Sequence, residues 1–246
     1  MKKLALQISP LVLSLALIAC TSAESQVQQK AEPGAETSSQ MNDSEQKDDS
    51  AKMDDTKQMD AMVDDAMADG GMKTAVVAGG CFWCVESDFE KLDGVSEVIS
   101  GYTGGTTANP TYEEVGHENT GHYEAAEIFY DPSVISYKQL LDYYWKTVDP
   151  TDPNGQFCDQ GESYRTAIFA SPDQKAIAEE SLAEVKQSKP FAAPIVTPVK
   201  DRVPFYKAED YHQDYYKTHS LKYKFYRTRC GRDARIEDLW GETVAH

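Results

Sequence analysis

Residues 73–246 are predicted to form an α+β domain, a ferredoxin-like (split βαβ) two-layer α/β sandwich with long loops and a C-terminal extension. The main observation is the order of the first six candidate elements, which is strand, helix, strand, strand, helix, strand. The second is periodicity, because apolar residues alternate in strand candidates and recur every three or four residues in helix candidates. The third is composition: an acidic region without aromatic residues ends near residue 72.

Each predicted element has its own sequence signal. The apolar run over residues 74–78 predicts the first strand, and Val85, Phe89 and Leu92 share one face of a helix predicted over 85–92. Further strands are expected over 95–100, 124–130, 165–170 and 195–199. A helix is expected over 137–148, after an N-cap at Ser136, and another from the capping-box pattern at 171 to about 187. A last helix is expected over 208–219. Two irregular segments, 102–121 and 149–162, have the length that is typical of functional loops.

Residues 1–19 have the pattern of an export signal, with a positively charged start and a short apolar core. The core is too short to span a membrane comfortably. Its end, Leu-Ile-Ala followed by Cys20, resembles the lipobox of bacterial lipoproteins, in which this cysteine is lipidated. We therefore expect a lipid anchor at Cys20 and a periplasmic location in a bacterial cell envelope. An aspartate after the lipidated cysteine is associated with retention in the inner membrane, so Thr21 at this position favours the outer membrane. The alternative interpretation of residues 1–19 is an ordinary signal peptide.

Residues 20–72 are predicted to be a disordered acidic tether. From Thr21 to Met72 there are thirteen acidic residues and four lysines, and no aromatic residue that a core would bury. Apart from Met1, all methionines of the chain lie here: Met41, Met53, Met59, Met62, Met67 and Met72. This row is interpreted as a target for oxidants, as a thioether site for a soft metal such as copper, or as compositional drift.

The net charge of −17 argues against nucleic-acid binding, which depends on basic surfaces. Four cysteines follow the lipobox: Cys81, Cys84, Cys158 and Cys230. An exported location permits structural disulfides, and redox chemistry fits these cysteines at least as well. A zinc site would need a second ligand pair, and a c-type haem would need His in place of Val85, so we expect no metal and no cofactor.

Cys81 is the first candidate for a nucleophile. It lies between a predicted strand and the start of a predicted helix, where backbone N–H groups favour the thiolate and lower the pKa of a thiol. Two other interpretations stay open. Cys81 is a buried small apolar residue in one, and the first half of a thioredoxin-like C-x-x-C pair with Cys84 in the other.

The motifs around Cys81 extend over the whole of residues 73–246. They comprise Gly80-Cys81-Phe82-Trp83 with Glu86, Gly101-Tyr102-Thr103-Gly104-Gly105, Asn109-Pro110-Thr111-Tyr112, Gly121-His122-Tyr123-Glu124-Ala125, Tyr130-Asp131-Pro132 and Asp159-Gln160-Gly161-Glu162-Ser163-Tyr164-Arg165. In order and spacing this set resembles the peptide methionine sulfoxide reductase A family.

The resemblance implies an activity and a site. The positions correspond to Cys81 as nucleophile, Glu124 as a buried acid of raised pKa, Tyr112 and Tyr164 as hydrogen-bond donors to the sulfoxide oxygen, Asp159 as a further carboxylate, and Phe82 and Trp83 as the pocket for the methyl group. The implied substrate is the S epimer of methionine sulfoxide in proteins or peptides. Attack leaves a sulfenic acid, a second thiol forms a disulfide with it, and a thioredoxin-like donor restores the enzyme.

The resemblance does not identify the resolving cysteine, because many members place it in a glycine-rich tail that this chain lacks. Cys84 and Cys230 rank level, and Cys158 ranks third because it neighbours Asp159. His122 and His212 match no catalytic position, so we expect structural roles for them. The competing functions are a thioredoxin-like disulfide oxidoreductase and a Met-rich metal-binding lipoprotein.

Overall fold

The computed structural model describes residues 71–117 and 119–241. The predictions of a signal segment, of lipidation at Cys20 and of an acidic tether therefore lie outside the described residues. Within the described ranges, no helix combines the length and the apolar character needed to cross a membrane.

The fold is mixed α/β and is built on a six-stranded sheet. Its strands are β1 (Lys73–Gly79), β2 (Val95–Thr103), β3 (Tyr123–Tyr130), β6 (Thr166–Ala170), β7 (Val199–Asp201) and β8 (Phe205–Lys207). Their order is β7-β6-β1-β3-β2-β8, and all neighbours are antiparallel except the pair β6 and β7. A separate two-stranded hairpin consists of β4 (Gly155–Gln156) and β5 (Asp159–Gln160).

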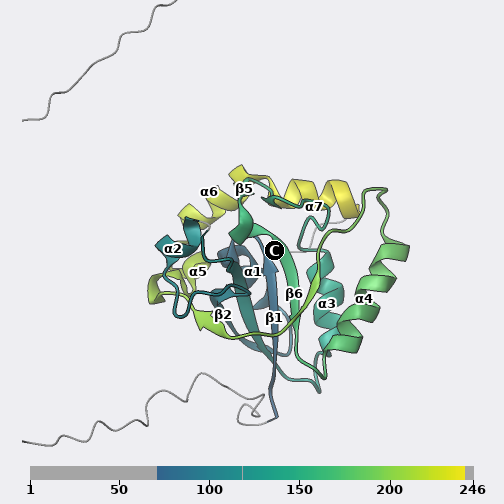
Figure 1. The fold of residues 1–246 in the computed structure, drawn as a ribbon. Helices are drawn as coiled ribbons and strands as arrows, with labels where there is room; N and C mark the ends of the chain where they lie inside the picture. Colours follow the sequence, from purple (N-terminus) through teal and green to yellow (C-terminus); the bar gives the residue numbers. More distant parts are fainter. Residues whose placement is uncertain (1–70, 118, 242–246) are drawn as a thin grey trace, which may run out of the picture. The chain divides into compact units, whose positions relative to one another are not determined.

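The helices divide into a group on the sheet and a C-terminal group. They are α1 (Phe82–Phe89), α2 (Tyr112–Gly116), α3 (Tyr137–Trp145), α4 (Lys175–Ser188), α5 (Tyr215–Thr218), α6 (Ser220–Cys230) and α7 (Arg232–Trp240), with short 3-10 turns at Glu162–Tyr164 and Asp210–His212. The main core joins α1, α3 and α4 to one face of the sheet. Figure 1 shows α3 and α4 side by side, and α6 and α7 in yellow along one end of the domain.

Strand β1 explains why the first apolar run is continuous. Its Ala75 and Val77 point into the main core beneath the helices, while Val76 and Ala78 belong to a smaller cluster on the opposite face. A strand that is buried on both faces needs apolar residues at every position. The β1 strand therefore runs through the centre of the domain and ends directly before Cys81.

The structure differs from several predicted elements, and it contains α6 and α7, over which no helix is predicted. The loop predicted over 102–121 contains α2, which a capping box between Thr111 and Glu114 begins. The strand predicted at 195–199 is found at Val199–Asp201, and β8 follows it. The single helix predicted over 208–219 is broken at Asp214, whose φ of 52° is left-handed and whose N–H donates to the Glu86 carboxylate.

Candidate active site

The sharp turn between β1 and α1 positions Cys81. Gly80 has a φ of +81°, and a side chain there would lie 2.6 Å from the Gln156 side chain, so both backbone conformation and space require glycine. The turn makes Cys81 the N-cap residue of α1, whose first turn continues with Phe82 and Trp83. The strand-to-helix location predicted for Cys81 is confirmed.

A small cavity of about 70 Å³ opens at this turn. Its lining consists of Cys81, Phe82, Trp83, Tyr112, Glu124, Asp159, Tyr164 and Tyr226. The first seven of these are the residues that the motifs single out, and they come from α1, α2, β3, β5 and a 3-10 turn. The fold therefore brings together residues that are up to 145 positions apart in the sequence, from Cys81 to Tyr226. Cys84 lies behind the lining, next to Cys81 and Tyr223.

Glu124 is a buried carboxyl aimed at the start of α1. It is 3% exposed, and its Oε2 accepts a hydrogen bond of 3.1 Å from the Phe82 N–H. Burial raises the pKa of Glu124 to about 8, and the neighbouring Asp159 adds to the rise. At neutral pH most Glu124 side chains are thus protonated. The cavity therefore contains a protonated carboxyl.

Cys81 and Cys84 carry free thiols one helical turn apart, and both are buried. Burial raises the pKa of Cys81 well above its ordinary value, and the thiol of Cys84 and the carboxyl of Glu124 raise it further. The pKa of Cys84 is lowered, because Cys81 donates a hydrogen bond to it and because the charges of Arg232 and Arg227 lie near. The sequence prediction that the pKa of Cys81 is lowered is therefore wrong for the resting site. Burial outweighs the N-terminus of α1.

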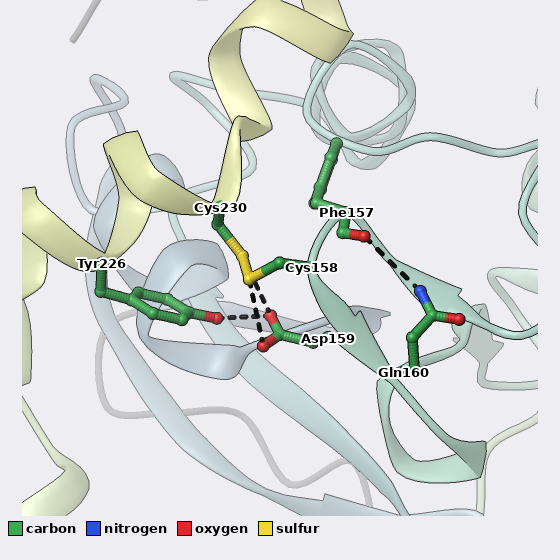
Figure 2. The surroundings of a disulfide bond; sticks show 6 residues. All are labelled: Phe157, Cys158, Asp159, Gln160, Tyr226 and Cys230. Carbon is green, nitrogen blue, oxygen red and sulfur yellow. Dashed lines mark hydrogen bonds between the residues drawn. A yellow bond between two sulfur atoms is a disulfide. The ribbon is translucent and has the colours of Figure 1, made fainter.

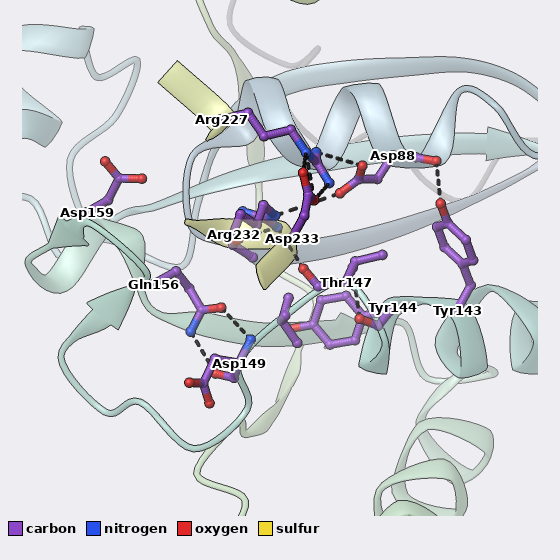
Figure 3. A network of polar contacts seen from close by, with 12 residues as sticks. Asp88, Tyr143, Tyr144, Thr147, Asp149, Gln156, Asp159, Arg227, Arg232 and Asp233 are labelled. Carbon is purple, nitrogen blue, oxygen red and sulfur yellow. Dashed lines mark hydrogen bonds and ion pairs between the residues drawn. The ribbon is translucent and has the colours of Figure 1, made fainter. Parts of the chain in front are cut away.

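The two arginines belong to a buried polar network behind the cysteines (Figure 3). Arg227 of α6 donates to Asp88 of α1 over 2.8 Å and also pairs with Asp233. Arg232 is 2% exposed and donates to the carbonyl oxygens of Gly79 and Thr147. This network joins the C-terminal helices to the end of β1 and supplies positive charge beside Cys84.

Tyr112 and Tyr164 face Glu124 across the cavity. Burial raises the pKa of Tyr112 to about 12 and raises that of Tyr164 further, so both hydroxyls keep their protons. The Tyr164 hydroxyl also hydrogen-bonds to Glu124. Two neutral O–H donors and one protonated carboxyl therefore surround the space where an acceptor oxygen of a substrate would lie.

Asp159 connects the cavity to a disulfide between Cys158 and Cys230 (Figure 2). Its carboxylate accepts a hydrogen bond from the Tyr226 hydroxyl and lies 3.7 and 3.8 Å from the two sulfurs. Burial raises the pKa of Asp159. While Cys158 and Cys230 form a disulfide, neither has a thiolate that could bind a metal or attack a sulfenic acid. Cys84, in contrast, has a free thiol and lies next to Cys81.

Trp83 is held in place by the segment that precedes α6. Its indole N–H donates to Nδ1 of His212 over 3.2 Å, and its ring stacks on Tyr215 at 3.8 Å between centroids. His122 lies elsewhere and binds the Gly105 N–H and the Thr107 carbonyl, so it fixes a loop. Both histidines thus have the structural contacts that the sequence predicts.

The residue that sequence reasoning misses is Tyr226. It lies on α6, lines the cavity and holds Asp159. The signal available in the sequence is the spacing of Tyr223, Tyr226 and Cys230, which places the three on one face of a helix. That face meets Cys81 and Cys84.

The comparisons with known proteins agree with this geometry. The family model "Peptide methionine sulfoxide reductase" matches residues 73–244. Peptide methionine sulfoxide reductase MsrA 2 of Caulobacter vibrioides is 50% identical over 176 residues, 72% of this chain and 89% of the relative. The MsrA of Bacillus licheniformis is 51% identical over 168 residues, 68% of this chain and 93% of the relative.

Among solved structures, methionine sulfoxide reductase A of Corynebacterium diphtheriae is similar with a TM-score of 0.56 at 30% identity. The match covers 63% of this chain and 78% of that one. The matched family region spans the described domain and includes the whole lining of the cavity. This chain belongs to the peptide methionine sulfoxide reductase family.

Proposed function

We propose that this chain reduces methionine sulfoxide in proteins and peptides to methionine, with the free sulfoxide as a further substrate. It thereby repairs oxidative damage. The observation that carries this proposal is one small cavity that holds both a free thiol, Cys81, and a buried, protonated carboxyl, Glu124. Reduction of a sulfoxide needs both groups, because sulfur must be attacked while its oxygen gains a proton. We assign the S epimer as substrate from the resemblance of the motifs to the family.

The substrate methyl group lies against Phe82 and Trp83, and the sulfoxide oxygen accepts hydrogen bonds from Tyr112 and Tyr164. Cys84, whose pKa is lowered, enters this step as a thiolate, and it accepts the proton of Cys81 along their hydrogen bond, which leaves Cys81 as the thiolate. The thiolate attacks the sulfoxide sulfur, Glu124 donates its proton to the oxygen, and the oxygen moves to Cys81. The products are methionine and a sulfenic acid on Cys81, and Glu124 is left ionised.

Cys84 is the resolving cysteine in this proposal. Its thiol attacks the Cys81 sulfenic acid, a disulfide forms, and the oxygen leaves as water. A dithiol donor of the thioredoxin kind then supplies two electrons and restores both thiols. Cys84 is favoured over the other two candidates because its thiol is free, whereas Cys158 and Cys230 form a disulfide with each other.

The test is turnover of both epimers of methionine sulfoxide by the wild type and by Cys81→Ser, with dithiothreitol as reductant. Wild type is expected to reduce the S epimer and to leave the R epimer unchanged, and Cys81→Ser is expected to reduce neither. Reduction of insulin disulfides that does not depend on Glu124 would instead support a disulfide oxidoreductase. Methionine formation by Cys81→Ser would show that Cys81 is not the nucleophile.

We also propose that the sheet and its helices form a ferredoxin-like split βαβ unit. The antiparallel order β6-β1-β3-β2, with α1 after β1 and α3 after β3, supports this assignment. In this view β7, β8 and the C-terminal helices are additions to the unit. Solving the structure experimentally and comparing the crossover handedness with that of such folds tests it; a left-handed crossover would contradict it.

We further propose that Cys20 is lipidated and holds the enzyme at a bacterial membrane, facing the periplasm. The lipobox-like ending of residues 1–19 supports this, and Thr21 favours the outer membrane. Metabolic labelling with a palmitate analogue tests the proposal, with Cys20→Ser as the control. Label on both proteins, or on neither, would contradict it.

A further inference from the structure

Outside Met1, every methionine of the chain lies in residues 41–72, and residues 73–246 contain none. We propose that methionine sulfoxides at positions 41, 53 and 59 are substrates of the pocket of their own chain, guided there by the outer face of α6. This inference rests on the proposed function and names a substrate for it. The segment then absorbs oxidant and is repaired in place.

The distance to the pocket sets which methionines can enter it. Cys81 lies eight residues after Lys73, mostly along β1, so the pocket is about 26 Å from the start of the strand at about 3.3 Å per residue. A path over the surface of the domain is longer. A methionine therefore needs more than 26 Å of chain before Lys73 to reach Cys81.

The length of chain between each methionine and Lys73 decides whether that methionine can reach the pocket. An extended chain spans at most about 3.5 Å per residue, so Met72 and Met67 reach only about 4 and 21 Å from Lys73. Met59 and Met53 reach about 49 and 70 Å, and Met41 reaches farther still, so these three have chain to spare. Met62 lies between the groups, at about 38 Å. The two nearest methionines are thus excluded from their own pocket.

Helix α6 offers a surface that suits this segment. Leu221 and Phe225, one turn apart, are 84% and 73% exposed. Lys222, Lys224 and Arg229 flank them, and none of the three forms an ion pair within the described parts of the chain. The helix contains no acidic residue. Its opposite side carries Tyr226, which lines the cavity, so the outer face lies about one helix diameter, roughly 10 Å, from the pocket.

The methionine-bearing segment is complementary to this face in charge and in polarity. Residues 41–72 contain ten acidic residues and three lysines, and the acids alternate with the methionines, as in Met53-Asp54-Asp55 and Met59-Asp60. Carboxylates opposite Lys222 and Lys224 leave thioether side chains to pack on Leu221 and Phe225. Because Lys222 and Lys224 are exposed, salt should weaken the attraction.

Linking substrate to enzyme changes the kinetics of repair. A flexible link of this length gives an effective substrate concentration of about 1 mM, which exceeds a micromolar concentration of other chains about 1000-fold. The chemistry is that of the proposed reaction: the sulfoxide oxygen moves to Cys81 and leaves as water, and a dithiol supplies the two electrons. Repair within the chain is then first order and independent of protein concentration.

The test uses the full chain with its free thiols capped as methyl disulfides while hydrogen peroxide oxidises the methionines. After removal of peroxide, dithiothreitol uncaps the thiols and starts repair, and mass spectrometry follows the oxygen adduct on each methionine over a hundredfold range of protein concentration. The S fraction at Met41, Met53 and Met59 is expected to disappear at a rate independent of concentration. The rate at Met67 and Met72 is expected to rise in proportion to it.

Proportional rates at all positions, or dilution-independent repair of Met67 and Met72, would overturn the inference. Turnover of N-acetylmethionine sulfoxide in the same samples separates this failure from failure of the proposed function. A Lys222→Glu, Lys224→Glu double variant is expected to slow repair within the chain about fivefold at low salt, with unchanged turnover of the small substrate. The matched control is Lys186→Glu with Lys207→Glu. Equal slowing in both would contradict guidance by α6.

Discussion

Replacing Glu124 with Gln probes the buried acid through stability as well as through activity. Gln has the same size and keeps an oxygen that accepts the Phe82 N–H, but it does not ionise. The pKa of Glu124 is about 8 in the folded protein against an ordinary 4.5. Between these values the folded state binds more protons than the unfolded state, so the free energy of unfolding of the wild type falls as the pH rises.

The size of this effect follows from the two pKa values. Full ionisation of Glu124 costs the folded state about 5 kcal/mol, and about 4 kcal/mol of this is lost between pH 5 and pH 9. Other groups titrate in both proteins and cancel in the difference. The free energy of unfolding of the wild type is thus expected to fall about 4 kcal/mol more than that of Glu124→Gln over this interval.

Guanidinium unfolding at pH 5, 7 and 9, followed by tryptophan fluorescence, measures the difference. The same variant is expected to reduce methionine sulfoxide at least about 100-fold more slowly, because it cannot donate the proton. In the wild type, the rate of one turnover is expected to fall as the pH passes about 8. Parallel stability curves for the two proteins would show that Glu124 is not a buried protonated acid.

Three further variants test the surroundings of the pocket. Cys158→Ser with Cys230→Ser opens a loop of 72 residues and is expected to lower the free energy of unfolding by about 4 kcal/mol. A disulfide between Cys81 and Cys84 should still form in the first turnover, and a Cys81 sulfenic acid that stays unresolved would contradict the assignment of resolution to the C-x-x-C pair. Tyr226→Phe removes the donor to the pocket carboxylate and is expected to lower kcat/KM about tenfold; an unchanged value would deny it a role. Gly80→Ala is expected to cost at least about 2 kcal/mol in thermal unfolding, and Gly116→Ala, which meets no neighbour, serves as the control; equal costs would contradict the turn geometry.

The sequence predicts the cavity better than it predicts the fold around it. Seven lining residues are those that the resemblance of the motifs to the family implies. The eighth, Tyr226, lies on a helix whose outer face is basic and carries Leu221 and Phe225, so its apolar spacing does not stand out. The same mixed pattern explains why α6 is not predicted.

Contacts between distant residues account for the other differences. The helix predicted over 208–219 breaks because Asp214 donates to Glu86, which is 128 positions away. The pairing of Cys158 with Cys230 likewise depends on where α6 lies. The pKa of Cys81 was predicted from the N-terminus of a helix, and the depth of burial that reverses it is a property of the folded domain.

One turnover without reductant shows whether Cys81 and Cys84 together carry the reaction. Protein with free thiols at Cys81 and Cys84 is mixed with an excess of methionine S-sulfoxide and quenched with a thiol-alkylating reagent. Mass spectrometry then maps the disulfides, and the methionine formed is counted. We expect one methionine per chain and a new disulfide between Cys81 and Cys84, with the Cys158–Cys230 disulfide unchanged from the starting protein. Methionine formed while Cys81 and Cys84 both remain alkylatable thiols would contradict the account.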